Sequence, residues 1–503
     1  MMQFLAEEYL YRLWARSNGR KFTVLVGDQW GDDGKGVVEA AVMEYFRACA
    51  RVAGGSNTGR TRYITGLDGK PHKQIFHLVP SGWADHKLSI IGDWVLLDLQ
   101  RLIDEITEIK AVIGEPKVDL LISKKAPVLM SYHLLLEQWI EACRGSFSAK
   151  PTGRGISAMV AGIDLRLGLQ IGHLAYPDLV RRYVETAYAA FLPILREMES
   201  QGMVKLAKHS PDSEIDRLLT LATGISDYVT DTDVVLQELA RHNVPTLFGL
   251  TQGSCLHFTG TYPNNSATHS IAQSAAYCSG LPMRAFGPVI MASKLLPTRV
   301  GAGPFPTHWW DRDAAEHFPK ERPELFSELE ACQPEVREQF LSEKRQLINS
   351  GQASRVDMAQ YFMVLGNELG ATTKRGREIG GPDLHETAWA CDLNGVDSLV
   401  LTRVDMLSGL QFTLPVCLNY SIDGRPVPRV VYPKPSEILD HAECNGTELP
   451  IDLIGSNLTG LGQYEELPDC VQELVRVYEK HLGVPVSLSM SAGADGKIFR
   501  LFD

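Results

Sequence analysis

A strand that runs directly into a glycine-rich loop and then a helix constrains the fold of this chain more than any other feature. Residues 22–26 (FTVLV) are an apolar, β-rich run that stops at Gly27, and a helical pattern follows from about Gly36 to Phe46. This order is typical of a buried parallel strand with a ligand-binding loop at its carboxyl end. The N-terminal part of the chain therefore predicts a ligand site beside its first strand.

Further short apolar runs alternate with helical stretches along the chain. The runs that fit central strands are 50–53, 88–91, 118–122, 246–248 and 398–402, and helical stretches between them include 96–110 and 132–143. This alternation predicts an α/β fold with a mainly parallel central sheet flanked by helices. Large α/β enzymes often form one continuous body, so we expect residues 1–503 to form a single domain.

Two segments lie outside this alternation. Residues 1–21 carry apolar side chains at the spacing of a short amphipathic helix, which we expect to pack on the body as an N-terminal extension. Residues 311–360 are rich in charged side chains and contain no glycine before Gly351. We interpret this second segment as a helical insertion on the surface.

Composition narrows the class of protein. The net charge of -12 argues against a protein that coats nucleic acid, although local cations and backbone N–H groups can still bind anions. Nine cysteines occur singly without a CxxC pair, which is typical of reduced thiols rather than of disulfides or a zinc site. There is no signal-peptide pattern and no run of 18 apolar residues. We expect a cytoplasmic protein with no nucleic-acid and no membrane partner.

The glycine loop, Gly27–Gly36 (GDQWGDDGKG), combines phosphate-binding features with two adjacent carboxylates, Asp32 and Asp33. Its glycines let backbone N–H groups approach phosphate oxygens, and Lys35 adds a cation at the start of a helix. It is not a standard phosphate loop, because Gly36 stands where the metal-binding hydroxyl would be. Asp32 and Asp33 would repel phosphate, but they make sense if one of them binds Mg²⁺ or accepts a proton. The alternative is a tight surface turn, which also favours Asp and Gly.

An ordered set of motifs resembles the signatures of the adenylosuccinate synthetase family, from about residue 22 to 502. GDQWGDDGKG resembles the family's GxQWGDEGKG, and TRVGAGPFPT at 298–307 matches its motif in full. The other matches are GGSNTGRT at 54–61, HLVPSG at 77–82, PTGRGI at 151–156, TQGSCL with GTYP at 260–263, GNELGATTKRGR at 366–377 and LTRVD at 401–405. The resemblance implies the family's P-loop-NTPase-like α/β fold. It also implies a ligase that joins L-aspartate to the 6-position of IMP with GTP hydrolysis, in purine nucleotide biosynthesis.

The resemblance implies a catalytic set of Asp32, Lys35, Arg60 and Gln252. Asp32 takes the place of the aspartate that removes the N1 proton of IMP and contacts Mg²⁺, the expected cofactor. The 6-oxygen of IMP then attacks the γ-phosphate of GTP, and the amine of aspartate displaces the resulting phosphate. Lys35 would stabilise the transferring phosphoryl group. Gly59 matches the glycine whose backbone carbonyl helps to hold Mg²⁺.

The positions that contact IMP in the family fall on Asn57, Thr152, Gln252 and Ser266. Ser266 replaces a threonine and keeps its hydroxyl group. Arg166 takes the place of the arginine that reaches the nucleotide phosphate of a neighbouring subunit. The resemblance therefore implies a homodimer in which Arg166 is shared between the subunits.

The aspartate-binding loop of the family corresponds to Thr372, Thr373, Arg375 and Arg377. Two arginines on one loop can hold carboxylates through paired hydrogen bonds, although the motif alone would also fit a solvated basic turn. Asp405 corresponds to the residue that reads guanine, which favours GTP over ATP. The positions implied to bind GTP are Gly31, Gly34, Lys35, Gly36, Arg403, Asp405, Ser491 and Gly493.

Several positions depart from the family pattern. The largest departure is Arg60, which stands where the family has a histidine that donates a hydrogen bond to the leaving GDP. Arginine remains a positive donor but cannot shuttle protons, so the hypothesis is electrostatic stabilisation by an internal arginine finger. Lys374 and Gly376 alter the aspartate loop, and Arg403 replaces a lysine.

These departures leave other functions open. One is a specialised ligase of the same family that uses a different 6-oxopurine nucleotide, amino acid or nucleoside triphosphate. Another is a nucleotide-binding protein that has lost catalysis. A generic P-loop GTPase switch is weaker still, because the Ser or Thr after the loop lysine is missing.

Overall fold

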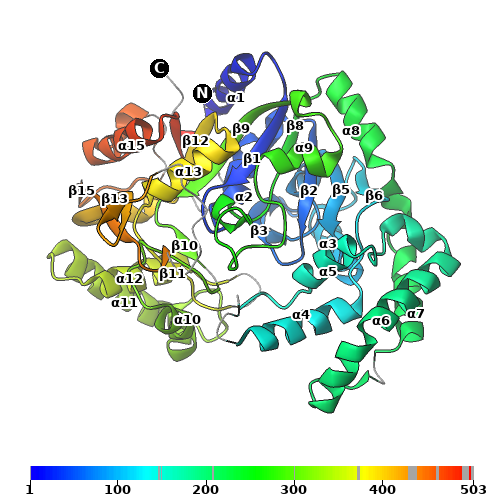
Figure 1. Ribbon diagram of the computed structural model, residues 1–503. Coiled ribbons are helices and arrows are strands. Elements are labelled where there is room, and N and C mark those ends of the chain that lie inside the picture. The colour runs from blue at the N-terminus through cyan, green and yellow to red at the C-terminus, as the bar shows by residue number, and fades with distance from the viewer. Residues whose placement is uncertain are drawn as a thin grey trace.

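The computed structural model describes residues 2–145, 148, 150–206, 209–299, 301–370, 374–428, 439–459, 461, 464–489 and 498–499, with the side chains of all but residues 2–6 and 498–499. A ten-stranded sheet in the order β17-β16-β12-β9-β1-β8-β2-β5-β6-β7 runs through the molecule (Figure 1). Its strands are β1 (Phe22–Gly27), β2 (Ala48–Gly55), β5 (Leu88–Leu96), β6 (Leu120–Ser123), β7 (Val229–Thr230), β8 (Thr246–Gly249), β9 (Phe286–Lys294), β12 (Ser398–Thr402), β16 (Val486–Ser489) and β17 (Ile498–Phe499).

Every neighbouring pair in this sheet is parallel except β16 and β17. The strands are buried on both faces, which explains their continuous apolar runs. The prediction of an α/β fold with a mainly parallel central sheet is confirmed.

Alternate residues of β1 face two different helical layers. Leu25 packs with α1 and α2 on one face, whereas Val24 and Val26 pack with α9, α13 and α15 on the other. A separate cluster joins β5 and β6 to α3, α6 and α7. The helices are α1 (Met2–Arg16), α2 (Lys35–Val42), α3 (Leu99–Ile113), α4 (Ser131–Arg144), α5 (Ile156–Asp164), α6 (Pro177–Ser200), α7 (Pro211–Thr223), α8 (Thr232–Arg241), α9 (Gln273–Ser279), α10 (Arg312–Glu321), α11 (Pro334–Asn349), α12 (Arg355–Gly366), α13 (Leu384–Asn394) and α15 (Asp469–Leu482).

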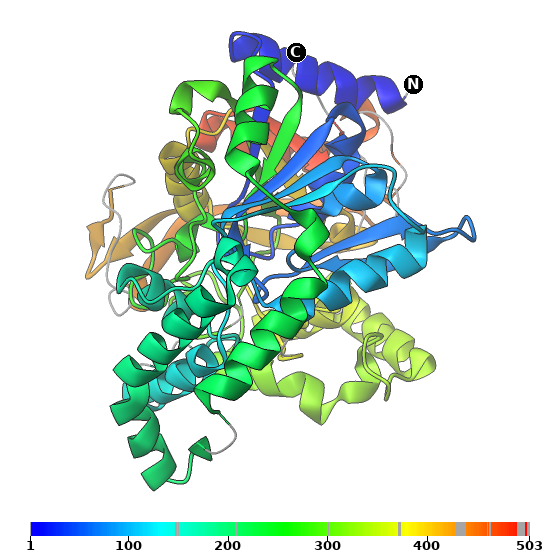
Figure 2. The ribbon, with the colours of Figure 1, turned by 90° about the vertical axis from the view of Figure 1, so that its right-hand side faces the viewer.

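The two segments predicted to be helical, residues 1–21 and 311–360, lie far apart in the fold (Figure 1). In α1, Tyr9, Leu10 and Leu13 are fully buried, and the indole of Trp14 donates a hydrogen bond to Thr23 at 3.0 Å. The segment 311–360 contains α10, α11 and the start of α12. These helices lie at the lower left of Figure 1, away from the projection formed by α4, α6 and α7. In Figure 2, α10 and α11 lie at the lower right, whereas α6 extends to the lower left. No helix in the described part of the chain is both long and apolar enough to cross a membrane.

Smaller sheets lie outside the central one. β3 (Arg60–Thr65) and β4 (Pro71–Phe76) form an antiparallel hairpin, and β10 (Thr298–Arg299) pairs with β11 (Glu378–Ile379). β13 (Gln411–Ile422) pairs with β14 (Arg425–Pro426) and β15 (Glu443–Asp452). Because parallel strands end at the same edge, the segments after β1, β2, β8, β9 and β12 emerge together. These segments carry most of the predicted site.

Candidate active site

The glycine loop is held from inside by the ammonium group of Lys35. Lys35 Nζ donates to the carbonyls of Gly31 and Gln252 at 3.0 and 2.7 Å, and it lies 3.0 Å from Asp33 Oδ2. It thereby links the loop after β1 to the segment after β8. Lys35 is buried, as are Asp28 and Asp33 of the same loop, so solvent does not screen its charge.

Gly34 shows why this loop needs glycine. It has φ = 82°, and a Cβ there would lie 2.6 Å from Thr402 Oγ1. Thr402 donates its hydroxyl to the Asp33 carbonyl at 3.0 Å. The last residue of β12 is therefore packed directly against the loop, and α2 begins immediately after the contact.

Asp32 lies in a network of four charged side chains. Its Oδ2 is 2.9 Å from Lys294 Nζ and 2.5 Å from Arg377 Nη1. Both cations also reach the buried Glu368, at 2.7 and 2.8 Å. Asp32 is 41% exposed, whereas Lys294 is 5% exposed. The network therefore fixes one oxygen of a carboxylate that solvent or a ligand can still approach.

The charges around Asp32 determine its protonation. Burial would raise the pKa of Asp32, but Arg377, Lys294 and Arg403 lower it well below the usual range. Asp32 is consequently an ionised acceptor at neutral pH. Burial raises the pKa of the adjacent Asp33, although Lys35 opposes that shift. Of the two loop acids, Asp32 is the one placed for chemistry, and Asp33 is internal to the loop.

A third acid of the loop, Asp28, is buried below it. Its Oδ2 accepts hydrogen bonds from Ser293 at 2.6 Å and from Thr387 at 2.7 Å. Burial and the nearby Asp33 raise the pKa of Asp28 to about 8. This carboxyl group links β1 to β9 and α13 and does not face the exposed side of Asp32.

Arg60, on the first residue of β3, points into the protein. Its guanidinium group pairs with Glu39 of α2 and donates to the carbonyl of Leu250. Arg60 is 6% exposed and Glu39 is fully buried. Ser81 donates its hydroxyl to the other oxygen of Glu39 at 2.8 Å. The arginine that replaces the family's histidine is thus held by a carboxylate behind the glycine loop.

The segment after β2 is supported by a buried arginine that the sequence did not indicate. Arg51 donates to the Gly55 carbonyl at 3.2 Å and to Thr58 Oγ1 at 2.6 Å. Burial lowers the pKa of Arg51 to about 9. Asn57, in the middle of this segment, has its Oδ1 buried without a hydrogen-bond partner among the described residues. Such an atom is available to a ligand.

The segment after β8 carries Gln252 and Ser266. Gln252 has φ = 64°, which aims its carbonyl at Lys35. Ser266 is held by a backbone bond from its N–H to the Leu256 carbonyl at 2.7 Å, and its hydroxyl lies 2.8 Å from Thr268 Oγ1. The predicted nucleotide side chains after β2 and β8 therefore come from neighbouring strands, since β2 pairs with β8.

Other predicted positions lie farther along the surface. Thr152 is half-buried just before α5, and Arg166 is exposed just after it with φ = 61°. Arg375 donates to the carbonyl of Lys150 at 3.4 Å. Thr372 and Thr373 lie outside the described residues, as do Ser491 and Gly493. The predictions for these four residues stay predictions.

The segment after β12 carries the residues predicted to read guanine. Arg403 has φ = 64° and is half-buried beside Asp405. Burial raises the pKa of Asp405, and Arg403 opposes that shift. Asp405 Oδ1 is buried without a hydrogen-bond partner within the described ranges. The carboxylate therefore retains an acceptor that no protein donor in those ranges satisfies.

Sequence reasoning missed Lys294 and Glu368, which complete the Asp32 network. Glu368 lies inside the quoted motif at 366–377, and Lys294 ends an apolar run four residues before Thr298. Lys294 could have been found from the sequence, because it is a lysine at the carboxyl end of a buried strand.

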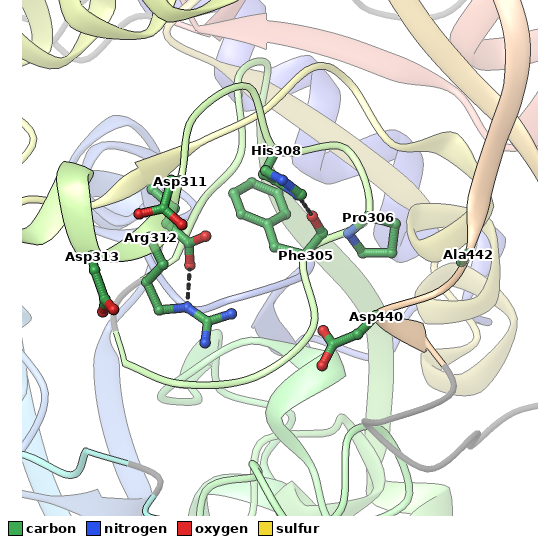
Figure 3. Close-up of a pocket in the computed structure, with 9 residues that line it drawn as sticks. Phe305, Pro306, His308, Asp311, Arg312, Asp313, Asp440 and Ala442 are labelled. Carbon is green, nitrogen blue, oxygen red and sulfur yellow. Dashed lines mark hydrogen bonds and ion pairs between the residues drawn. The ribbon is translucent and has the colours of Figure 1, made fainter. Parts of the chain in front are cut away.

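A cavity of about 280 Å³ lies beside the start of α10 and the segment that precedes it (Figure 3). Four carboxylates line it, from Asp311, Asp313, Glu378 and Asp440. Arg312, its one arginine, is 2.9 Å from Glu378. This negative lining suits neither a phosphate nor a carboxylate, so the cavity is not part of the anion site.

Asp32 is the carboxylate of this site that is open to a metal ion. No group of three or more His, Cys, Asp or Glu side chains forms a metal site in the part of the chain that the structure describes. Mg²⁺ is commonly held by one or two carboxylates together with substrate phosphates. Asp32 is ionised and partly exposed, and Lys294, Thr298 and Arg377 all donate to its Oδ2. Asp32 Oδ1 and the carbonyl of the exposed Gly59 are oxygens of the type that Mg²⁺ prefers.

Comparison with known proteins agrees with this geometry. The model of the family described as adenylosuccinate synthetase matches residues 24–498. The adenylosuccinate synthetase of Myxococcus xanthus is 31% identical over 480 residues, covering 94% of this chain and 96% of its own. That of Desulfovibrio desulfuricans is 30% identical, covering 94% and 98%. The structure of fully ligated adenylosuccinate synthetase from Plasmodium falciparum superposes with a TM-score of 0.75 at 22% identity, covering 96% of this chain and all of that one. This chain belongs to the adenylosuccinate synthetase family, whose members are GTP-dependent C–N ligases.

Proposed function

We propose that this protein joins L-aspartate to IMP with hydrolysis of GTP and forms adenylosuccinate. The observation that carries the proposal is the Asp32 network, in which a partly exposed, ionised carboxylate lies between a phosphate-type loop and the arginine of a carboxylate-type loop. A GTPase switch would not need Arg377 on the loop aspartate. A ligase must hold a phosphoryl donor, a proton acceptor and an amino acid in one place.

In the first step, Asp32 accepts the N1 proton of IMP while the 6-oxygen attacks the γ-phosphate of GTP. The IMP side chains in this proposal are Asn57, Thr152, Gln252 and Ser266. Lys35 and the loop glycines stabilise charge on the transferring phosphoryl group. Arg60 stabilises charge on the leaving diphosphate, which requires bound GTP to replace Glu39 or Leu250 as a partner of its guanidinium group.

In the second step, the amine of aspartate displaces phosphate from carbon 6. Arg375 and Arg377, with Thr372 and Thr373, hold the carboxylates of the amino acid. Arg377 already contacts Asp32, so sharing Arg377 with a substrate carboxylate removes part of the positive charge from Asp32. The pKa of Asp32 then rises, and the amino acid makes Asp32 a stronger base.

Asp405 reads the N1–H and 2-amino group of guanine in this proposal, with Arg403, Ser491 and Gly493 beside the nucleotide. Its unpartnered Oδ1 among the described residues supports the assignment, because adenine offers no matching donors. Asp32 and the carbonyl of Gly59 would hold Mg²⁺. When bound, Mg²⁺ supplies positive charge that screens the phosphates of GTP.

We further propose a cytoplasmic homodimer in which Arg166 of each subunit reaches the nucleotide of the other. Arg166 is itself exposed, and it follows Leu165, whose apolar side chain is 60% exposed. An interface between two subunits would cover this side chain. A mixture of Asp32→Asn and Arg166→Ala subunits should regain part of the activity that each variant alone lacks. No recovery on mixing would contradict the shared site.

The function is tested by incubating the protein with Mg²⁺, aspartate, GTP and IMP, and following product by ultraviolet absorbance and mass spectrometry. ATP and GMP serve as matched substitutes for the donor and the acceptor. Adenylosuccinate formed only with IMP and GTP supports the proposal. Turnover of another nucleotide or amino acid would instead indicate a specialised ligase, and tight binding without turnover would indicate an inactive relative.

A further inference from the structure

The loop Lys374–Arg377, called the arginine loop below, departs from the family pattern at Lys374 and Gly376. Both positions contact the helical insertion, residues 311–360. Lys374 Nζ lies 3.4 Å from Glu328, which follows α10 in the insertion. Gly376 packs against the backbone of α10. The two residues of the arginine loop that depart from the family pattern therefore both contact the helical insertion.

Glu328 connects three parts of the molecule. It pairs with Lys374 of the arginine loop and with Lys73 of β4, which projects from the sheet beside the glycine loop's helix. Both lysines lower the pKa of Glu328, although burial opposes them. Glu328 is therefore ionised at neutral pH, and it bridges two cations that would otherwise be held apart by their like charge.

The contact at Gly376 leaves no room for a side chain. A Cβ at this position would lie 2.1 Å from the carbonyl oxygen of Ala315, in the middle of α10. Because that neighbour is helical backbone, it cannot turn aside as a flexible side chain would. The glycine thus fixes how closely the arginine loop approaches the insertion.

Helix α10 also binds Lys150, which contacts the arginine loop, and Glu378, which follows the loop. Lys150, whose carbonyl accepts from Arg375, has its ammonium group 3.1 Å from Asp313 and 3.4 Å from Glu316 of α10. After the loop, Glu378 pairs with Arg312 at the start of α10, which Figure 3 shows within the acidic cavity. The insertion therefore contacts the arginine loop at Lys374 and Gly376, and it also holds Lys150 and Glu378 beside the loop.

We propose that the insertion holds the arginine loop in the position that receives the amino-acid substrate, and that Glu328 is a positioning residue for this site. This inference rests on the proposed function for the identity of the substrate, an amino acid with a side-chain carboxylate. A loop with three cations in four residues repels itself and is costly to order on binding. Fixing the loop in the folded protein removes that cost from the binding step and strengthens the grip on the substrate carboxylate.

The test compares Glu328→Gln with Glu338→Gln. Both remove one negative charge from the insertion with little change in size. Glu338 is 70% exposed and pairs with Arg337 of its own helix, so it is a matched control. Two readouts are made: hydrogen exchange of the peptides that cover residues 374–379, and separate KM values for aspartate, GTP and IMP.

We expect Glu328→Gln, but not Glu338→Gln, to increase exchange in these peptides. The KM for aspartate should rise about fivefold, the upper range for one ion pair of this exposure, while kcat and the other two KM values change by less than about twofold. Gly376→Ala should also raise the KM for aspartate and increase exchange in these peptides, because its Cβ displaces the loop without removing a charge. Recovery of a normal KM in Glu328→Asp would support the ionic nature of the contact.

Equal exchange in the Glu328 and Glu338 variants would overturn the proposal. So would increased exchange with an unchanged KM for aspartate, because the contact would then order the loop without serving the substrate. If the wild-type protein does not turn over aspartate at all, the proposed function fails. The exchange measurement then still decides whether the insertion fixes the loop.

Discussion

Replacing Arg60 with alanine tests the role of the arginine that stands in place of the family's histidine. The substitution removes a guanidinium group from a buried pair and leaves Glu39 with one side-chain donor among the described residues, the hydroxyl of Ser81. The same guanidinium group is also proposed to stabilise charge on the leaving diphosphate. The variant is therefore expected to lose both stability and turnover, for different reasons.

The size of each loss follows from the burial of the pair. Arg60 is 6% exposed and Glu39 is not exposed at all, so solvent cannot compensate the carboxylate that remains. Breaking such a pair on one side typically costs about 3–5 kcal/mol of unfolding free energy. Removing one donor that stabilises charge in a transition state typically lowers kcat by about 10²–10³-fold.

Glu39→Gln is the matched variant, because it breaks the same pair while it retains the arginine. Urea unfolding without substrates measures the stability of both variants, and kcat is measured at a temperature where each is folded. Both variants should lose comparable stability, but Arg60→Ala should lose at least ten times more turnover than Glu39→Gln. A double variant should lose less stability than the sum of the two single losses.

Three results would refute this reasoning. Wild-type kcat in folded Arg60→Ala would show that Arg60 does not act on the reaction. Equal losses of kcat in the two variants would show that Arg60 acts only through its pair with Glu39. An unchanged unfolding free energy in Arg60→Ala would contradict the buried ion pair itself.

Three further predictions concern the carboxylates. Asp32→Asn should lower kcat, measured at saturating GTP, IMP and aspartate, by about 10²–10⁴-fold, the range for a lost general base; retained turnover would contradict the role of Asp32. Asp405→Asn should reduce the preference for GTP over ATP, measured as the ratio of kcat/KM values, and an unchanged ratio would remove Asp405 from guanine recognition. Burial and Asp33 raise the pKa of Asp28 to about 8, above its value in the unfolded chain. Protonation of Asp28 therefore stabilises the folded protein fully below about pH 4, and this stabilisation is lost as the pH rises through about 8. Between these values Tm should decline with pH, and Asp28→Asn should flatten the decline; parallel curves for the two proteins would count against the buried protonated acid.

The sequence predicts the part of this site that depends on strand order. Apolar runs indicated β1, β2, β8 and β12, and the glycine loop was expected to bind a ligand at the carboxyl end of β1, whereas Asn57, Gln252 and Asp405 were assigned from the resemblance to the family. Local chemistry identified Lys35 and the pair Asp32 and Asp33, and the resemblance to the family selected Asp32. These inferences needed only periodicity, glycine positions and one run of motifs.

What the sequence could not predict are pairings between distant side chains. Arg60 alternates inward along β3, but nothing in the sequence indicates that its partner is Glu39. The same applies to Lys294, which reaches Asp32 from β9 across the sheet edge. The charged composition of the insertion predicted helices, but not that α10 would lie against Gly376. Each of these contacts is set by tertiary packing, where spacing along the chain carries no information.

The most direct test of the central claim follows the 6-oxygen of IMP. The protein is incubated with GTP, Mg²⁺, aspartate and IMP labelled with ¹⁸O at position 6, and the released phosphate and the purine product are analysed by mass spectrometry. Phosphoryl transfer to the 6-oxygen, followed by displacement by the amine, predicts that the label leaves with inorganic phosphate and is absent from adenylosuccinate. Unlabelled phosphate accompanying product, or no product from a folded protein, would contradict the account.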